Sequence, residues 1–447
     1  MRKYLWFVCL LSAFLFQQIM AAQEAGKPGA ASGGAFAGKW IVTSDFYGTP
    51  LYFGMLLEQQ GEKLTGNFDG DKLEGAATGK SIHFLAKDEN GGTEDATGTL
   101  EGDTITGTVT FKNDSDPTHP ETHTFTAKLN PMRRAAAPKR HEFSPRTFYR
   151  RFSAENKPVL TIAPGDTIHT TTVDAGGTDE KGVTRVLGGN PETGPFFVET
   201  AAPGDTLVVH IKRLRLNRDY AISDDGIVGR GLTTDWAVKM KDGFKDVRWH
   251  LDLANGTASP EKPGEHMTHY AIPVRPMLGC VGVAAGSAQA PPGSGDSGRF
   301  GGNMDFNEVV EGATVYLTVN VPGALLYFGD GHALQGDGEL NGNALETSMD
   351  VEVTVDVIPD KHTPGPRVES ETHLMAMGLA GSLDDAFREA TGNMAAWLTD
   401  KYKLTPSEIA QVMGTSAEYK VSEVADRNAG MVVKIKKERL AGLAAVK

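Results

Sequence analysis

Short runs of alternating polar and apolar residues, separated by turns rich in glycine, aspartate and asparagine, make up residues 39–130. Leu64-Thr-Gly-Asn-Phe68 and Ile105-Thr-Gly-Thr-Val109 are two such runs. This pattern indicates many short strands joined by tight turns. We therefore predict a small β-barrel or meander here, and an accessory stabilising or binding role, because the region contains no cluster of catalytic residues.

The N-terminus indicates export. Arg2 and Lys3 precede an apolar run that ends at Phe16, and Ala21-Ala22 offers a cleavage site, so residues 1–22 are predicted to be a signal peptide. The apolar run is shorter than the ~20 residues that span a bilayer. We expect cleavage, a secreted or periplasmic location and no stable membrane anchor afterwards. An uncleaved anchor is the alternative.

Two segments are predicted to be linkers. Residues 23–38 are rich in glycine, alanine and proline and are expected to form a flexible spacer. Residues 131–147 are basic and contain several prolines, which is typical of an exposed linker between domains. The second domain is therefore predicted to span residues 148–447.

Charge and cysteine content exclude some functions. The formal net charge of −13 at pH 7 argues against nucleic acid as a partner, because phosphate binding needs a concentrated basic face. Cys9 would leave with the signal peptide, so no disulfide could form within the mature chain. Cys280 lies in an apolar run, where a buried small side chain is a better interpretation than a nucleophile.

A repeated phrase marks strand starts in the second domain. In each copy, a turn with glycine precedes a β-branched run, and three such starts predict a β-sandwich-type scaffold. The chain ends differently, with a helical pattern over residues 382–403 that Ser382 caps together with Asp385, and a second helix start at Thr405-Pro406. The fold class is therefore mostly β (α+β), with C-terminal helices. The three copies are residues 163–168, 202–207 and 310–315.

Residues 329–346 combine five glycines with side chains that can bind a metal. They follow an apolar run that ends at Phe328 and is predicted to be a buried strand. Asp330 and His332 are two residues apart, so in an extended backbone they would share a face. Imidazole and carboxylate ligands suit zinc, and Glu339 could move the proton of a water that zinc activates. The alternative is a surface hairpin in which polar side chains only complete the turns.

Two further pairs are candidates. His169 lies in a predicted strand and Asp174 at the turn that follows it, while Asn303 and Asp305 come directly after a loop rich in glycine, serine and proline. A strand histidine with a turn aspartate is more often a hydrogen-bonded structural pair than a metal site. Neither pair alone indicates a function.

Taken together, these stretches resemble the acetamidase/formamidase family. The resemblance covers about residues 148–437 and implies a mainly β fold, a bound metal, a homo-oligomer and hydrolysis of the C–N bond of small linear amides to a carboxylate and ammonia. The export signal and the N-terminal β domain are additions, and Thr200 stands where a glycine is expected. The matching phrases are GPFFVETAAPGDTLVVHI (194–211), RPMLGCVGVA (275–284), the whole run 301–339, and LDDAFREATGNMAAWLTDKYKL (383–404).

The resemblance and the chemistry of the side chains together give a predicted site. The cofactor is expected to be a divalent metal, with zinc first and calcium as the alternative. The competing hypothesis is a metal-stabilised, non-catalytic scaffold that binds through its N-terminal β domain. The predicted roles are catalysis for Glu339, Asp330 and Asp305, substrate binding for Asn303 and Gln335, and metal binding for His332, Asp174 and His169.

Overall fold

The structure is a computed structural model, and it describes residues 34–113, 116, 118–130, 137–286 and 290–443. The predicted signal peptide and residues 23–33 of the predicted spacer lie outside the described residues. Among the residues that are described, no helix is both long and apolar enough to cross a membrane.

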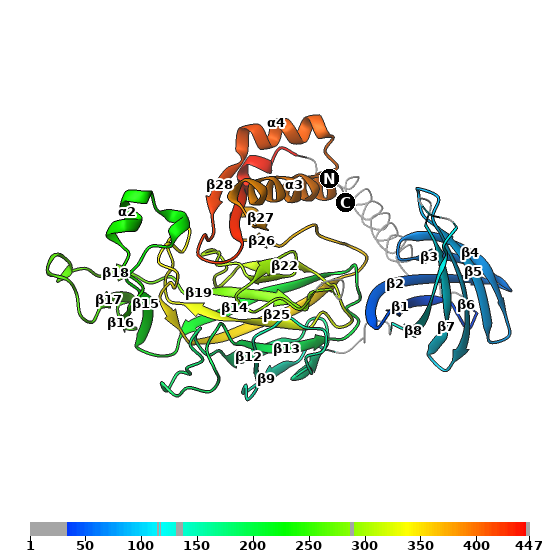
Figure 1. Cartoon of the computed structure of the whole chain (residues 1–447), viewed down its shortest axis with the longest axis horizontal. Coiled ribbons are helices and arrows are strands. Elements are labelled where there is room, and N and C mark those ends of the chain that lie inside the picture. The colour runs from blue at the N-terminus through cyan, green and yellow to red at the C-terminus, as the bar shows by residue number, and fades with distance from the viewer. Residues whose placement is uncertain (1–33, 114–115, 117, 131–136, 287–289, 444–447) are drawn as a thin grey trace, which may run out of the picture.

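The predicted small β domain is a closed barrel of eight strands, each paired with its neighbours in chain order and the last with the first (Figure 1). Alternate residues point inward, and the interior is filled by side chains such as Trp40, Phe68 and Phe84. The prediction of a barrel is confirmed. The strands are β1 (Gly38–Phe46), β2 (Thr49–Gln60), β3 (Lys63–Phe68), β4 (Asp71–Thr78), β5 (Ser81–Lys87), β6 (Thr93–Glu101), β7 (Thr104–Lys112) and β8 (Glu121–Leu129).

The second domain contains a nine-stranded sheet. All three predicted strand starts fall in it, and they lead into β12, β14 and β22, so this prediction is confirmed. In sheet order its strands are β28 (Glu418–Val421), β29 (Ala429–Lys436), β27 (His373–Ala380), β26 (Arg367–Glu369), β22 (Thr314–Thr318), β14 (Thr206–Leu216), β25 (Met349–Ile358), β12 (Thr167–Thr171) and β9 (Arg140–Glu142).

A twelve-stranded sheet forms the other layer. Its main path runs through β18 (Ile272–Pro273), β17 (Thr257–Pro260), β16 (Asp246–Asp252), β15 (Tyr220–Asp224), β24 (Glu346–Thr347), β23 (Leu326–His332), β19 (Met277–Val283), β21 (Gly301–Asn303) and β20 (Ser297–Gly298). The remaining strands are β13 (Glu192–Val198), which pairs with β23, and β10 (Phe148–Tyr149) and β11 (Leu160–Ile162), which pair with β13.

The two sheets share one apolar core. Val209 of β14 and Val353 of β25 belong to the same buried cluster as Val281 of β19 and Phe328 of β23. Burying one such side chain stabilises a fold by ~1.5–3 kcal/mol, so the core fixes the two layers firmly against each other. The predicted β-sandwich is confirmed. Strand β23, which ends at His332, packs against its core.

The helices lie mainly at the C-terminus, on the outer side of the nine-stranded sheet (Figure 1). The side-chain oxygen of Ser382 accepts from the amide of Asp385 at the start of α3 (Leu383–Tyr402), as predicted. A capping box with Thr405 starts α4 (Pro406–Ser416). Leu383 and Phe387 of α3 are exposed, whereas Ala386, Ala390 and Met394 are buried. The short helices are α2 (Thr234–Lys239) and the 3-10 turns Gly229–Gly231, Glu265–Met267 and Lys437–Leu440.

The junction between the barrel and the sandwich differs from a simple linker. Residues Arg140–Glu142, inside the predicted linker, form β9 and pair in parallel with β12. Asn130, just after β8, donates its side-chain amide to the carbonyl of Thr200 at 3.0 Å. Thr200 has a φ of 68°, a backbone conformation that favours glycine, which explains why glycine was expected there.

Candidate metal centre

The candidate centre lies where β23 ends. His332 is its last residue, and Glu346 of β24 is its direct partner across the sheet. Asp305 follows β21, and Glu339 follows β23 in the glycine-rich stretch. The φ angles of Asp305, Asp330 and Glu339 are 40°, 51° and 46°, in the left-handed region that non-glycine residues rarely adopt. Such backbone strain clusters at functional sites, and here it turns three carboxylates towards one place.

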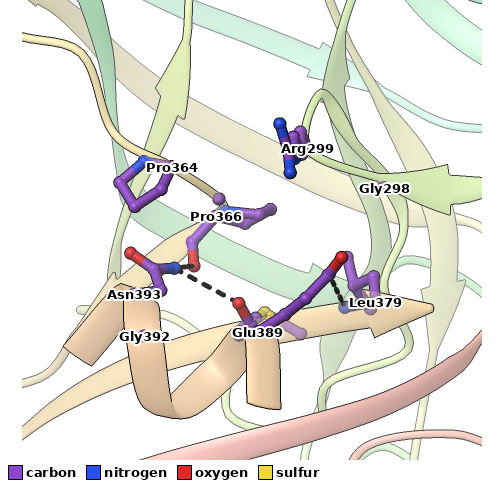
Figure 2. Close-up of a pocket in the computed structure, with 10 residues that line it drawn as sticks. Gly298, Arg299, Pro364, Pro366, Leu379, Glu389, Gly392 and Asn393 are labelled. Carbon is purple, nitrogen blue, oxygen red and sulfur yellow. Dashed lines mark hydrogen bonds between the residues drawn. The ribbon is translucent and has the colours of Figure 1, made fainter. Parts of the chain in front are cut away.

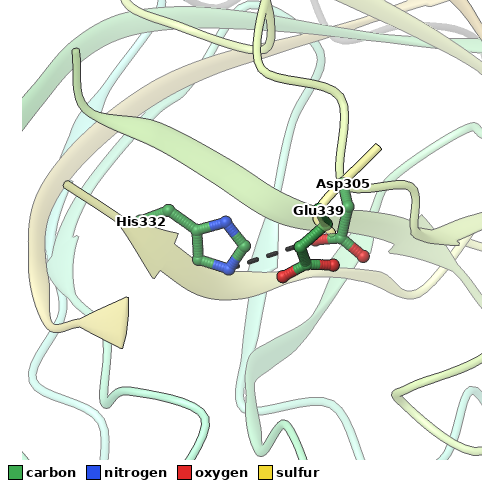
Figure 3. A group of neighbouring side chains, drawn as sticks. All are labelled: Asp305, His332 and Glu339. Carbon is green, nitrogen blue, oxygen red and sulfur yellow. Dashed lines mark ion pairs between the residues drawn. The ribbon is translucent and has the colours of Figure 1, made fainter. Parts of the chain in front are cut away.

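Four carboxylates surround the Nε2 atom of His332. That atom lies 3.1 Å from Glu346 Oε1, 3.5 Å from Asp330 Oδ2 and 4.0 Å from Asp305 Oδ1. Figure 3 shows Asp305 and Glu339 on one side of the imidazole. Two groups, Asp305–His332–Glu339 and Asp330–His332–Glu346, each place their three ligand atoms within 4.8 Å of one another. The predicted residues Asp305, Asp330, His332 and Glu339 are therefore brought together.

Several polar atoms of this cluster are buried without a hydrogen-bond partner. They include His332 Nε2, Asp305 Oδ1, Asp330 Oδ1 and Glu346 Oε2. Leaving a buried polar atom unsatisfied costs ~1–3 kcal/mol, and more when the group is charged. One imidazole nitrogen and several carboxylate oxygens are ligands of a divalent cation, so the residues present fit a bound metal.

The electrostatics of the cluster also favour a cation. Burial raises the pKa of Glu339 and Asp305 well above the usual range, and neighbouring carboxylates raise it further. Burial raises the pKa of Glu346 to about 7, although His332 opposes this shift. For His332, burial lowers the pKa, but Glu346 and Asp330 outweigh it and hold the pKa well above the ordinary value. Like charges this close resist ionisation together unless a positive charge is present.

Gln335 fixes the orientation of His332. The imidazole Nδ1 lies 2.9 Å from Gln335 Oε1, and the Gln335 amide donates to the carbonyls of Asp305 and Ser422. Because an amide oxygen can only accept, Nδ1 carries a proton, so in the neutral imidazole Nε2 is the atom available as a ligand. The predicted substrate-binding role of Gln335 finds no support in these contacts, because its polar groups are occupied within the protein.

Asn303 is occupied in a similar way. Its amide nitrogen donates to Asp305 Oδ2 at 2.7 Å and to Asp426 Oδ2 at 2.6 Å, and its oxygen accepts from Asn190 at 3.1 Å. Asn303 thus holds Asp305 rather than presenting free groups to a substrate. Its predicted substrate-binding role is not supported by the geometry.

The structure does not bring His169 or Asp174 to the centre. His169 lies in β12 of the other sheet, where its ring nitrogens contact Glu142 and Asp350 at 2.6 Å and 3.0 Å. Asp174 forms a buried ion pair with Arg218 at 2.6 Å. Both side chains have protein partners, so neither joins the predicted metal ligands. This is the main correction to the predicted site.

Other parts of the centre were not predicted. Glu346 is the last residue of the glycine-rich stretch 329–346, but the sequence analysis predicted no role for it. Glu423 and Asp426 come from the loop between β28 and β29. Burial raises the pKa of Glu423 to about 8, and Asp426 adds to that shift. Glu192 of β13 is fully buried, and neither of its carboxylate oxygens has a hydrogen-bond partner.

Gly279 and Cys280 of β19 lie beside the acidic side chains. A Cβ atom at Gly279 would lie 2.5 Å from Asp305 Oδ1 and 2.6 Å from Asp330 Oδ2, so glycine leaves room for both carboxylates. Cys280 is fully buried, as predicted, and burial raises its pKa well above the ordinary value. A thiol in that state is a poor nucleophile.

A separate pocket of about 200 Å³ lies against α3 (Figure 2). Asn393 of α3 donates to the carbonyl of Pro366, Glu389 of α3 accepts from the amide of Leu379, and Arg299 also lines the pocket. None of the residues that line it belongs to either group around His332. We therefore place the chemistry at the buried cluster and not in this pocket.

Comparison with known proteins agrees with these observations. Residues 289–374 match the model of the acetamidase/formamidase family. A curated Schizosaccharomyces pombe protein, whose name gives formamidase as a provisional assignment, is 44% identical over 59 residues. That segment spans 13% of this chain and only 14% of the yeast protein.

Two solved structures are similar over a much longer range. A crystal structure of an acetamidase from Bacillus halodurans has 26% identity and a TM-score of 0.58, and covers 68% of this chain and 100% of its own. A predicted acetamidase/formamidase from Thermoanaerobacter tengcongensis has 30% identity and a TM-score of 0.58, and covers 68% of this chain and 98% of its own. The predicted resemblance is confirmed, and this chain belongs to the acetamidase/formamidase family.

Proposed function

We propose that the chain is an exported, metal-dependent amidase that hydrolyses the C–N bond of small linear amides to a carboxylate and ammonia. The observation that carries the proposal is the buried His332 Nε2, which lies among carboxylates, three of which each have one buried oxygen without a hydrogen-bond partner. Membership of the acetamidase/formamidase family supports amide hydrolysis as the reaction. The names of the similar proteins support formamide and acetamide as the first substrates to try.

His332, Asp330 and Glu346 are the proposed metal ligands. Their ligand atoms form one of the two close groups, and the two carboxylates lie nearest to Nε2. A divalent cation held there would supply a Lewis acid and lower the pKa of a water molecule. Zinc is the first candidate, and calcium is the alternative because carboxylate oxygens outnumber the single nitrogen.

Glu339 and Asp305 are the proposed proton carriers. Glu339 is buried, its Oε1 accepts from the amide of Ala344 at 3.2 Å, and burial raises the pKa of its carboxyl well above the ordinary value, which makes the ionised form a stronger proton acceptor. In the reaction, the oxygen of water forms a bond to the amide carbon, and the C–N bond breaks. Glu339 takes a proton from the water and delivers it to the leaving nitrogen. Asp305, which Asn303 holds in place, keeps a second carboxylate beside that path.

The test is ammonia release from formamide, acetamide and several longer amides by residues 23–447. We expect activity as purified, loss after chelation, and recovery with zinc or calcium. Glu339→Gln should lower kcat by ~10²–10⁴-fold, the usual contribution of a general acid–base group. Asp337→Asn, in the same loop but 57% exposed, is the matched control and should leave kcat unchanged.

Two outcomes of the ammonia-release test would contradict parts of the proposal. A protein that binds the metal but releases no ammonia from any amide would contradict the amidase proposal and favour the scaffold hypothesis. Activity that survives complete metal removal would contradict the metal dependence alone.

Export and assembly are separate parts of the proposal. The charge and hydropathy of residues 1–22 support export, and N-terminal sequencing of protein recovered outside the cytoplasm should begin after Ala22. Trp236, Val238 and Phe244 are exposed apolar side chains close together in the sequence, which supports contacts between copies of the chain. Light scattering of the purified protein should give a mass above that of one chain.

A further inference from the structure

We propose that Arg218 and Asp174 form a positioning pair that fixes Glu346 opposite His332 and so sets the affinity of the centre for its divalent cation. The inference rests on the proposed function, because it concerns the same centre. It also gives a role to Asp174, which the sequence suggested as a metal ligand.

Arg218 lies in the turn between β14 and β15, and its side chain is only 1% exposed. Its guanidinium makes contacts on every side. Nη2 donates to Asp174 Oδ2 at 2.6 Å and to the carbonyl of Glu346 at 3.2 Å, and Nε donates to Thr347 Oγ1 at 2.9 Å. The guanidinium also stacks on the ring of Tyr220, 4.1 Å from its centre. Two of these contacts go directly to β24.

Strand β24 depends on such contacts because it is very short. It contains only Glu346 and Thr347. It pairs with β23 through Glu346–His332 and Thr347–Gly331, and with β15 through Glu346–Ile222. A strand of this length has too few ladder bonds to hold its own register, and a small shift would move the Glu346 carboxylate away from Nε2. Arg218 supplies this constraint, because it donates to the Glu346 carbonyl and to the Thr347 hydroxyl.

Asp174 in turn holds Arg218. Its Oδ1 accepts from the amide of Thr178 at 2.8 Å, and its Oδ2 receives the guanidinium. A buried guanidinium needs a carboxylate partner, because an unpaired buried charge is costly. Asp174 therefore acts on the centre only through its contact with Arg218. The order of contact runs from Asp174 to Arg218, to β24, to the Glu346 carboxylate.

Lysine cannot replace Arg218 in this arrangement. The guanidinium is a planar fork with five donors, while an ammonium group is a point charge with three. Arg218→Lys keeps the charge but loses the simultaneous contacts to Asp174, Glu346 and Thr347. Changes to residues that hold metal ligands usually weaken metal binding by ~10–100-fold, and we expect a change of this size.

The experiment measures dissociation constants for zinc and calcium ions by competition with a chelating dye, using residues 23–447. Arg218→Lys and Asp174→Asn should both bind more weakly than the unchanged protein. Arg367→Lys is the matched control: Arg367 is also a buried arginine, but it bonds to Asn393 under α3. It should lower the thermal midpoint of the metal-free protein and leave metal affinity unchanged.

A double-mutant cycle separates positioning from general destabilisation. If Arg218 acts through Glu346, Arg218→Lys should weaken metal binding in the unchanged protein and by no more than about twofold in a Glu346→Gln background. An equal loss in both backgrounds would overturn the proposal. If Glu346→Gln binds no cation, a milder pair decides. Thr347→Ser, which keeps the hydroxyl, should bind more tightly than Thr347→Val, and equal affinities would overturn the proposal.

The outcomes also separate this inference from the proposed function. An unchanged protein that binds neither zinc nor calcium would remove the metal dependence and the inference together. An unchanged protein that binds a cation, beside an Arg218→Lys protein that binds it equally well, would remove the inference alone.

Discussion

The barrel and the sandwich each contain a cluster of acidic side chains, and the two clusters differ in their surroundings. In the barrel, Glu94 lies near Asp69, Asp71 and Asp88, and burial and these charges raise its pKa to about 7. The sandwich places its carboxylates around an imidazole that is wholly buried. In the barrel, protonation of Glu94 is enough to relieve its repulsion with the three aspartates.

The comparison shows which features separate the candidate metal centre from the acidic cluster in the barrel. Around His332, Gln335 fixes one ring nitrogen and leaves the other facing the carboxylates. Asn303 and Arg218 hold the strands and loops that carry the acids. The presence of several carboxylates does not distinguish the two clusters. A fixed imidazole, full burial and side chains that hold the ligands do.

The largest expected effect comes from removing the imidazole. His332→Ala should abolish measurable zinc binding, together with ammonia release, because the cluster loses its only nitrogen ligand. Glu94→Gln, in the barrel, is the paired control and should change neither. Metal content measured by atomic emission on both proteins tests this. Retained metal in His332→Ala would mean that the carboxylates alone form the centre.

A smaller effect concerns pH. The folded-state pKa values of Glu423, about 8, and Glu346, about 7, lie above those of an unfolded chain. The folded metal-free protein therefore binds more protons, and its stability should fall as pH rises from about 5 to about 8. Bound metal needs ionised carboxylates, so it should raise the thermal midpoint more at pH 8 than at pH 5. Calorimetry with and without metal would show this, and a flat metal-free profile would contradict it.

The smallest effect is expected in the barrel itself. Because Glu94 has a raised pKa, its ionised form destabilises the fold above that pKa. Glu94→Gln should raise the thermal midpoint of the barrel slightly at pH 8 and leave it unchanged at pH 4.5. A lower midpoint at pH 8 would show that the ionised carboxylate is stabilising, and that the two clusters are more alike than we infer.

The sequence was most informative where structure depends on near neighbours. The alternation in residues 39–130 predicted the barrel strands, and Ser382 and Thr405 predicted the helix starts, because these patterns act within a few residues. The glycine-rich stretch after Phe328 predicted His332, Asp330 and Glu339 for a similar reason. The three residues lie within ten residues of one another in the sequence.

The rest of the site depends on contacts between distant segments. His169 looks much like His332 in the sequence, since each is a strand histidine near an aspartate. Only the fold shows that one pairs with Glu142 and Asp350 across the sheet, while the other has a free nitrogen. Nothing near Asp174 indicates Arg218, and nothing near Asn303 indicates Asp426. These pairings arise from the order of the strands in the sheets.

The loop between β28 and β29 has a consequence for the order in which the protein folds. This loop supplies the Ser422 carbonyl that Gln335 binds, and Asp426, which binds Asn303. It lies near the end of the chain. A chain in which the barrel and most of both sheets have formed still lacks these supports for His332 and Asp305. Assembly of the candidate centre therefore waits for residues 422–426 to reach their places between β28 and β29.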